Sequence, residues 1–352
     1  MSLAAAWPVL TGPRVEDYGV EVLTRDEHHA GRLDGVTGGR AEFNVNATIR
    51  GGFQVTLRDV GQDLDWSSMR LRPWVRVNDL TWPLGVFLPA SPRLSHDEHG
   101  SSWEVPCLDK MSVLDQDVTT EAYSVPAGTV VTQRVAAIIS GVGEHSAITP
   151  SDLTTRSPLT WEPGTTKLRI VNDLLDSINY FSLWADRTGL LRAEPYRRPQ
   201  DRALAATFAR GEAAIHSPRW SREQDIAGVP NRTVLLVEGD DDNPGMVAVA
   251  DNTDPDSPYS IPRRGRVVAR VYENVEAADQ STLDALAQRY LLEASSPSAV
   301  LSVEHATIPL DGNQVVRFAS QGVDALAAVE GYSVNLQAGA LMAGTWREVV
   351  ST

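Results

Sequence analysis

Residues 161–196 read WEPGTTKLRIVNDLLDSINYFSLWADRTGLLRAEPY, and this stretch decides the fold of the chain. Within it, apolar residues recur at steps of three and four, which predicts a helix of about three turns with one apolar face. The apolar positions are Leu168, Val171, Leu174, Leu175 and Ile178. We expect the polar Asn172, Asp173 and Asp176 to face away from the core, and Thr165 or Thr166 to cap the first turn.

A β-hairpin is predicted directly after this helix. Residues 180–185 and 190–194 are strand-like runs, and the turn between them ends in Gly189, which is free to adopt the left-handed conformation. A short helix on a two-stranded ribbon cannot bury its apolar faces alone. The stretch must therefore pack between other elements of the chain.

The residues that precede this stretch read as strands. The apolar residues Phe53, Val55 and Leu57 alternate with polar residues, and the same alternation recurs elsewhere before residue 109. The other predicted strands lie at 43–47, 69–77, 82–88 and 102–108. Regular strands with Gly- and Pro-rich turns are typical of a barrel or sandwich. We predict an N-terminal β-barrel domain over residues 1–108.

Two further domains are predicted after residue 108. Residues 109–218 form an α+β domain, because a second helical stripe at 131–139 precedes the helix and hairpin described above. Residues 219–352 form a C-terminal β-barrel domain with one helix at about 279–295. Strands are expected here at 233–237, 246–250, 266–272, 300–308, 315–318, 329–336 and 345–350. The predicted fold class is β-dominated α+β, with two tube-like β-barrel domains bracketing a mixed α+β domain.

One strand presents a row of large polar side chains. Alternation places Arg70, Arg72, Trp74 and Arg76 on the face opposite its apolar residues. The row is either a solvated face or a contact between subunits, in which Trp74 is the apolar anchor and the arginines pair with a neighbour's carboxylates. The acidic loops at 240–242 and 251–256 are the candidate partners.

The composition is that of an ordinary globular protein, with 42% apolar and 22% charged residues. A formal net charge of -15 argues against nucleic-acid binding, which needs clustered Lys and Arg. No long apolar run and no basic N-terminal region occur, so neither a membrane span nor a secretory signal is predicted. Cys107 is the one cysteine, which excludes an internal disulfide, and we expect a buried thiol on a strand.

The sequence contains no recognisable catalytic motif. We find no Gly-x-Ser-x-Gly elbow, Walker loop or His-Glu-x-x-His pattern, and therefore predict no catalytic, cofactor-binding or metal-binding residues. Two kinds of cluster offer a metal-binding alternative. His96 and His99 share a turn with Asp97 and Glu98, which either binds a metal or is a solvated hairpin tip. The acidic loops at 238–242 and 251–256 offer oxygen ligands for calcium, but neither has the EF-hand spacing.

Short turn and packing segments recur along the chain: Trp161–Gly164, Tyr180–Asp186, Asp34–Gly39, Trp82–Pro89, Leu114–Asp117, Arg222–Asp225, Val229–Asn231, Asp254–Pro258 and Arg264–Arg266. These segments resemble those of minor tail proteins of siphophages that infect actinobacteria. The resemblance implies a structural tail tip (baseplate) hub protein without enzymatic activity. It also implies a homotrimeric ring in which each chain contributes two barrels, so that six similar units meet a six-fold tail tube.

The same resemblance implies the partners and the place of the protein. The expected neighbours are the distal tail protein, the tape measure protein and tail fibre or tip proteins, and the genomic DNA passes through the ring without specific binding. The protein would be synthesised in the host cytoplasm and reside in the virion. Two alternatives stay open. One is a receptor- or carbohydrate-binding tail tip module, in which some of the nine Trp residues would form exposed aromatic rows that bind the ligand. The other is a cell-wall hydrolase.

Overall fold

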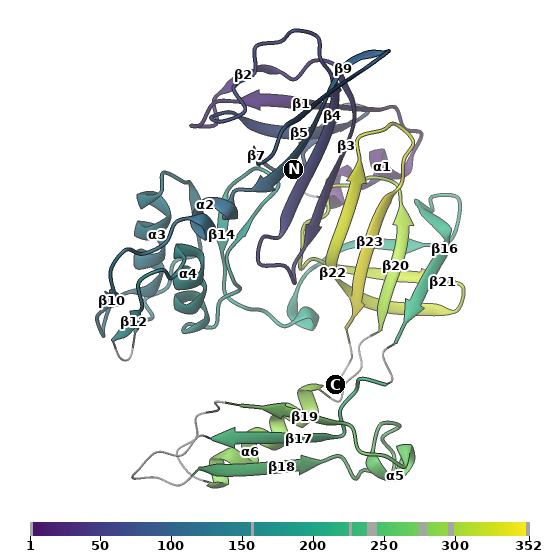
Figure 1. Ribbon diagram of the computed structural model, residues 1–352. Helices are drawn as coiled ribbons and strands as arrows, with labels where there is room; N and C mark the ends of the chain where they lie inside the picture. The colour runs from purple at the N-terminus through teal and green to yellow at the C-terminus, as the bar shows by residue number, and fades with distance from the viewer. Residues whose placement is uncertain are drawn as a thin grey trace. The chain divides into compact units, whose positions relative to one another are not determined.

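The computed structural model describes residues 3–155, 158–224, 227–237, 245–273, 275, 280–294 and 299–349, and it is dominated by strands (Figure 1). The chain divides into two compact units. Unit 1 contains residues 1–220 and 302–346, and unit 2 contains residues 221–301 and 347–352. The β-dominated class expected from the sequence is confirmed.

The elements follow one another along the chain in a regular order. The first half contains α1 (Leu3–Thr11), β1 (Glu16–Leu23), β2 (His29–Arg32), β3 (Val36–Asn44), β4 (Gly51–Arg58), β5 (Arg70–Val77), β6 (Leu80–Pro83), β7 (Phe87–Pro89), β8 (Arg93–Asp97), β9 (Gly100–Asp109), α2 (Met111–Gln116), β10 (Tyr123–Val125), α3 (Val131–Gly141), β11 (Ser146–Ile148), β12 (Leu159–Trp161) and α4 (Lys167–Asp176). The second half contains β13 (Trp184–Ala185), β14 (Leu191–Ala193), the 3₁₀-helix η1 (Pro199–Asp201), β15 (Leu204–Ala209), β16 (His216–Glu223), β17 (Arg232–Val237), β18 (Met246–Asp251), α5 (Ile261–Arg264), β19 (Ala269–Tyr272), α6 (Gln280–Ala294), β20 (Val300–His305), β21 (Val315–Ser320), β22 (Val323–Asn335) and β23 (Met342–Glu348).

The largest sheet joins strands from opposite ends of the sequence. Its strand order is β16-β20-β23-β22-β3-β4-β9-β7-β5-β1-β2, with β6, β8, β15 and β21 paired beside this path. The joint is the antiparallel pairing of β22 with β3, from Gly331 opposite Asn44 to Asn335 opposite Arg40. Among the described strands, the sequence of paired strands has two free ends and does not close on itself. The two closed barrels therefore stay a prediction.

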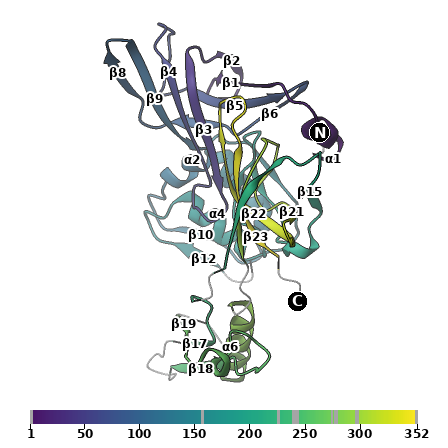
Figure 2. The same cartoon turned by 90° about the vertical axis from the view of Figure 1, so that its right-hand side faces the viewer.

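The strands around β4 enclose the first apolar core. Phe53, Val55 and Leu57 are buried on one face of β4, as their alternation predicts. The strand predicted at 43–47 is misplaced, because β3 ends at Asn44 and Val45 already lies beyond it. Most of β3 lies upstream, where Gly38 and Gly39 supply no apolar side chains, so its alternation is weak in the sequence. Figure 2 shows the β8–β9 hairpin extending at one end of these strands.

A helical module is formed by α2, α3 and α4 together with β10 to β14, and Figure 1 shows its helices gathered together. The helix predicted from the apolar stripe is α4, and the Thr166 hydroxyl caps it by accepting a hydrogen bond from the Arg169 amide at 3.2 Å. All five apolar positions of the stripe are buried in the core of the module. The predicted helix is therefore confirmed in place and in orientation.

The polar side of α4 differs from the expectation. Asp173 accepts a hydrogen bond from the indole Nε1 of Trp161 at 2.7 Å, and the Asn172 amide oxygen accepts one from the backbone of Leu183 at 2.9 Å. Two of the three side chains expected to face solvent thus hold neighbouring segments of the module. Of the three side chains, Asp176 alone is exposed with no side-chain hydrogen bond to a described residue.

The predicted hairpin is also confirmed. β13 and β14 pair antiparallel, and Gly189 in their turn has a φ of 90°. A Cβ at Gly189 would lie 2.6 Å from the Cγ2 of Val86, so this turn packs tightly against another part of unit 1. β14 pairs in parallel with β11 on its other side, which makes the hairpin part of a three-stranded sheet.

Unit 2 has a core of its own. Its sheet has the order β18-β17-β19, and α6 packs on one face through Leu283, Ala287 and Leu291. The Thr233 hydroxyl donates a hydrogen bond of 2.8 Å to the backbone oxygen of Ala287, which ties the helix to the central strand. The helix expected at about 279–295 is therefore confirmed over its described part. No helix in the described parts of the chain is long and apolar enough to span a membrane.

Candidate functional site

The predicted contact row lies on β5, which pairs antiparallel with β1. Two of its arginines form ion pairs with carboxylates on β1 of the same chain. Arg72 lies 2.6 Å from Glu21, and Arg76 lies 2.5 Å from Asp17, in each case directly across the strand pair. Because these guanidinium groups are already paired, this face carries both signs of charge and is not a basic stripe.

Trp74 lies between these two arginines and covers Gly19 on β1. A Cβ at Gly19 would lie 2.5 Å from the Trp74 ring, so the glycine makes room for the indole. The guanidinium groups of Arg32 and Arg76 lie 5.5 Å and 5.9 Å from the ring centroid, in cation–π contact. Trp74 is half-buried, so part of the ring stays available for a contact with another molecule.

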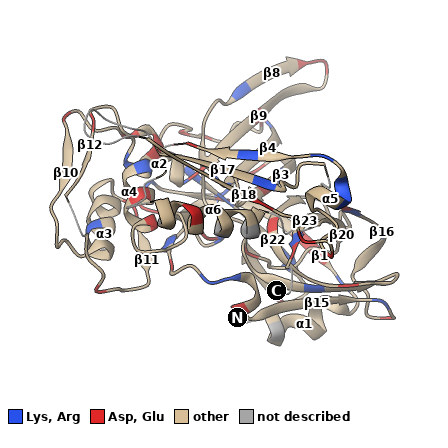
Figure 3. Ribbon diagram, turned by 90° about the horizontal axis from the view of Figure 1, so that it is seen from below, with Lys and Arg blue, Asp and Glu red and all other residues tan. Residues whose placement is uncertain are grey.

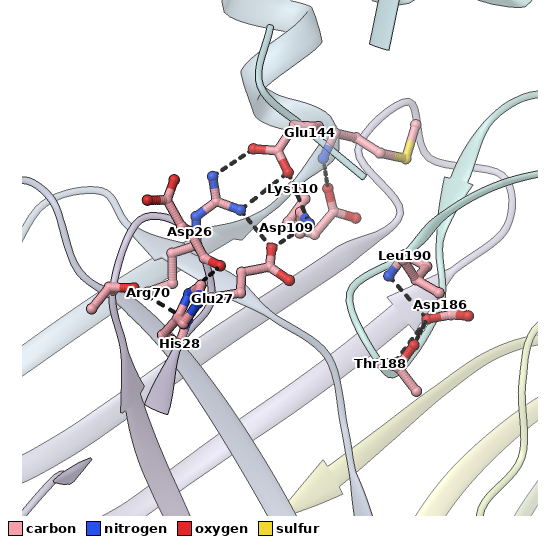
Figure 4. Close-up of polar contacts among 12 residues, drawn as sticks. Asp26, Glu27, His28, Arg70, Asp109, Lys110, Glu144, Asp186, Thr188 and Leu190 are labelled. Carbon is pink, nitrogen blue, oxygen red and sulfur yellow. Dashed lines mark hydrogen bonds and ion pairs between the residues drawn. The ribbon is translucent and has the colours of Figure 1, made fainter. Parts of the chain in front are cut away.

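Arg70, at the start of the same row, has a different environment. It belongs to a buried ion cluster with Glu27, Lys110 and Glu144, whose side chains point toward one another in Figure 4. The guanidinium lies 2.5 Å from Glu144 and 2.7 Å from Glu27, and Lys110 Nζ lies 2.8 Å from Glu144 and also contacts Glu27. Arg70 is therefore engaged inside unit 1, and the contact face proposed from the sequence is reduced to Arg72, Trp74 and Arg76.

The charges of the buried ion cluster compensate one another. Burial raises the pKa of Glu144, but hydrogen bonds from Arg70 and Lys110 outweigh this effect and hold the pKa below its ordinary value. Burial likewise lowers the pKa of Arg70, but the hydrogen bond and charge of Glu144 raise it overall. Lys110 is fully buried, and two carboxylates balance the two cations. The cluster thus brings two basic side chains and two carboxyl groups together inside the protein.

The buried ion cluster connects the strands to the helical module. Glu27 comes from the β1–β2 turn, Arg70 from β5 and Lys110 from the junction of β9 and α2, whereas Glu144 follows α3 in the module. Of these four residues, Arg70 alone is singled out by the sequence pattern. Lys110 could have been noticed in the sequence, because it is one of only two lysines in the chain.

The described members of the other polar groups singled out in the sequence lie at or near the surface. Asp251 pairs with Arg232 of the same sheet at 2.6 Å, and the loop at 240–242 lies outside the described residues. His96 and His99 are exposed on the β8–β9 hairpin. Within the described ranges, no three His, Cys, Asp or Glu side chains gather where they would hold a metal ion.

The single cysteine lies where the sequence analysis expected it. Cys107 is buried on β9, and burial raises the pKa of its thiol to about 12.

Acidic and basic residues are interspersed along the ribbon (Figure 3).

One prediction concerns pH and rests on two buried groups in unit 1. Burial lowers the pKa of His305 to about 4, while the ring donates from Nδ1 to the Ala306 oxygen and packs against Phe208 in a tilted arrangement. The charges of Arg14 and His216 lower it further. Stability from this ring is present above pH 6.5 and is lost as the pH falls toward 4. The difference in unfolding free energy between wild type and His305→Phe should grow by on the order of 3 kcal/mol from pH 4 to pH 7.

Asp109 is a control whose stability contribution has the opposite pH dependence to that of His305. Burial raises its pKa from 3.8 to about 6, so its contribution is present below pH 3.8 and is lost as the pH rises through 6. The difference between wild type and Asp109→Asn should therefore shrink over the same range. Urea unfolding at several pH values between 4 and 7 measures both differences. Equal slopes for the two variants would show that these side chains do not titrate as their burial requires.

Comparisons with solved structures identify the class of fold. The chain is similar to a tail protein from Neisseria meningitidis (TM-score 0.67, 13% identity, covering 95% of this chain and 97% of that chain). It is also similar to a prophage MuSo2 43 kDa tail protein from Shewanella oneidensis (0.68, 13%, 95% and 98%). A third match is prophage tail protein gp18 from Listeria monocytogenes (0.57, 13%, 95% and 95%). No family model matches the chain, and no curated protein matches it in sequence. The chain therefore has the fold of phage tail proteins.

Proposed function

We propose that this protein is a structural hub of a phage tail tip, which joins the tail tube to the tip or fibre proteins. The observation that carries the proposal is the likeness to two phage tail proteins over at least 95% of each chain. The matched proteins and this chain have nearly equal lengths, so the likeness extends over both of its compact units. The siphophage origin, with an actinobacterial host, rests on the short segments quoted above.

The finer part of the proposal is a homotrimeric ring with two tube-like barrels in each chain. The joint between β22 and β3 supports it, because strands from the two ends of the sequence flank this joint as two arms of one sheet. In a ring, the same heterologous contact repeats around the axis until it closes. A net charge of -15 suits a conduit that DNA and the tape measure protein pass without binding.

The proposed partners are other tail proteins: the distal tail protein, the tape measure protein, and fibre or tip proteins. The proposed location is the virion, after synthesis in the host cytoplasm. We propose no enzymatic activity, since the matched structures are described as tail proteins. A receptor- or carbohydrate-binding module and a cell-wall hydrolase are the alternatives. Glycan binding by a monomer would favour the first, and clearing of host cell wall in a zymogram would favour the second.

The oligomeric state tests the proposed contact face. We expect the wild-type chain to form trimers in solution and the Trp74→Ala, Arg72→Glu variant to dissociate at least tenfold more readily. The reason is that a buried Trp anchor commonly contributes about 2 kcal/mol or more to an interface. Analytical ultracentrifugation across a concentration series measures the change. A wild-type protein that is monomeric in the assembled tail would contradict the proposed trimeric ring.

A charge swap separates the interface from the folding of β5. Because Arg72 pairs with Glu21, reversing Arg72 alone also places two like charges across the β1–β5 strand pair. The double variant Glu21→Arg, Arg72→Glu restores this pair. If the swap restores the trimer, the loss came from the strand pair and the contact face is elsewhere. If the swapped chain stays folded and dissociated, the face belongs to the interface.

A further inference from the structure

Arg50 is a buried cation that forms no ion pair or side-chain hydrogen bond with any residue the structure describes. It precedes β4 and is only 9% exposed, and its Nη1 atom is buried with no hydrogen-bond acceptor in reach. Its backbone oxygen accepts from the Asn44 amide at 2.8 Å, which fixes the residue at the end of the β3–β4 hairpin. Within the described residues, no carboxylate lies within ion-pair distance of this guanidinium. Burial of a cation without a counter-ion is strongly unfavourable, so the site calls for an anion.

The charged group that acts on Arg50 from inside the protein is Asp109, and it is poorly suited as a counter-ion. Both of its carboxylate oxygens are used by backbone amides, since Oδ2 accepts from Gly51 at 2.6 Å and Oδ1 from Met111 at 2.8 Å. Asp109 therefore holds the start of β4 and of α2. Its carboxylate forms no hydrogen bond with the Arg50 guanidinium.

An open pocket of about 570 Å³ lies against Arg50, between the β3–β4 hairpin and strands β22 and β23. One wall is apolar, where Phe43 and Tyr332 stack with ring centroids 5.5 Å apart. Hydroxyl donors come from Ser333 and Thr345. Two acids also line the pocket: Glu42, which pairs with Arg40 at 3.4 Å, and Glu330.

We propose that this pocket binds a carboxylate, which the Arg50 guanidinium holds through two parallel N–H···O bonds. A planar guanidinium fork matches a carboxylate geometrically. The size of the pocket and its apolar wall allow a ligand larger than acetate. The carboxylate belongs either to a free acid or to an Asp or Glu side chain of another protein. The site is independent of the oligomeric state proposed above.

Ligand-dependent unfolding tests the site. Thermal unfolding of the full chain at pH 7.5 is compared in sodium acetate and in sodium chloride of equal ionic strength. Ligand that binds the folded state raises the Tm with its concentration. We expect acetate to raise the Tm of the wild type and of Arg93→Met, a control on the exposed strand β8. For Arg50→Met, the apparent Kd should be at least tenfold weaker, while Arg50→Lys, which keeps the charge but not the fork, should lie between them.

A second arm identifies the source of the carboxylate. The same titration is made with a blocked Asp-Glu peptide at equal carboxylate concentration. Binding at least tenfold tighter than acetate supports the site with a protein side chain as its ligand, and equal affinity supports it with a free acid. Arg50→Met is expected to fold, because it removes an uncompensated buried charge. Equal Tm rises in wild type and Arg50→Met, or no rise with either ligand in wild type, overturn the proposal.

Discussion

Replacing Glu144 with Ala is expected to lower the free energy of unfolding by about 3–5 kcal/mol. The side chain is 1% exposed and contacts both cations of the buried ion cluster. Without it, Arg70 and Lys110 share Glu27 alone, which leaves one buried positive charge uncompensated. Urea denaturation followed by tryptophan fluorescence measures the loss. At acidic pH the loss should shrink, because the depressed pKa of Glu144 contributes stability that disappears as the pH falls through the folded-state pKa.

Two further variants separate charge balance from packing. The double variant Lys110→Met, Glu144→Met removes one charge of each sign and leaves Arg70 paired with Glu27, so it should cost less than Glu144→Ala alone. Asp324→Ala, which breaks the exposed ion pair with Arg317, should stay within about 1 kcal/mol. A double variant that loses as much as the single variants Lys110→Met and Glu144→Met added together would contradict the role of charge compensation.

The buried ion cluster illustrates what a sequence pattern leaves out. A period of two correctly predicts which face of β5 Arg70 occupies, but it does not tell what covers that face. Arg70 lies where the helical module packs, and Arg76, on the same face, is exposed. Glu27 and Glu144 are 117 residues apart and meet through tertiary packing alone. Their role was therefore beyond local reasoning.

The elements that the sequence does predict are those with a strong apolar period. Helix α4 and strand β4 follow directly from their stripes, because burial selects the same face that the pattern marks. Strand β3 was shifted, since its glycines carry no apolar signal. The pairing of β22 with β3 joins residues almost 300 positions apart, and alternation alone does not choose a strand's partner. The candidate site at Arg50 depends on that same pairing, and so it was not foreseen.

The second large effect is expected in α4. Leu174→Ala should destabilise the chain by about 2–5 kcal/mol, because the side chain is fully buried and its loss leaves a cavity. Leu174 belongs to the same apolar core as Val135 and Ile139 of α3, so the cavity would open between the two helices. Chemical denaturation gives the size of the loss.

Two substitutions on the polar side of α4 serve as graded controls. Asp176→Ala should change the unfolding free energy by less than about 0.5 kcal/mol, because the side chain is exposed. Asp173→Ala should cost about 1 kcal/mol, because the Trp161 indole loses its acceptor at 2.7 Å. The expected order of loss is thus Leu174, Asp173, Asp176. Equal losses at Leu174 and Asp176 would mean that the apolar face of α4 is misassigned. Equal losses at the two aspartates would mean that the bond to Trp161 adds no stability.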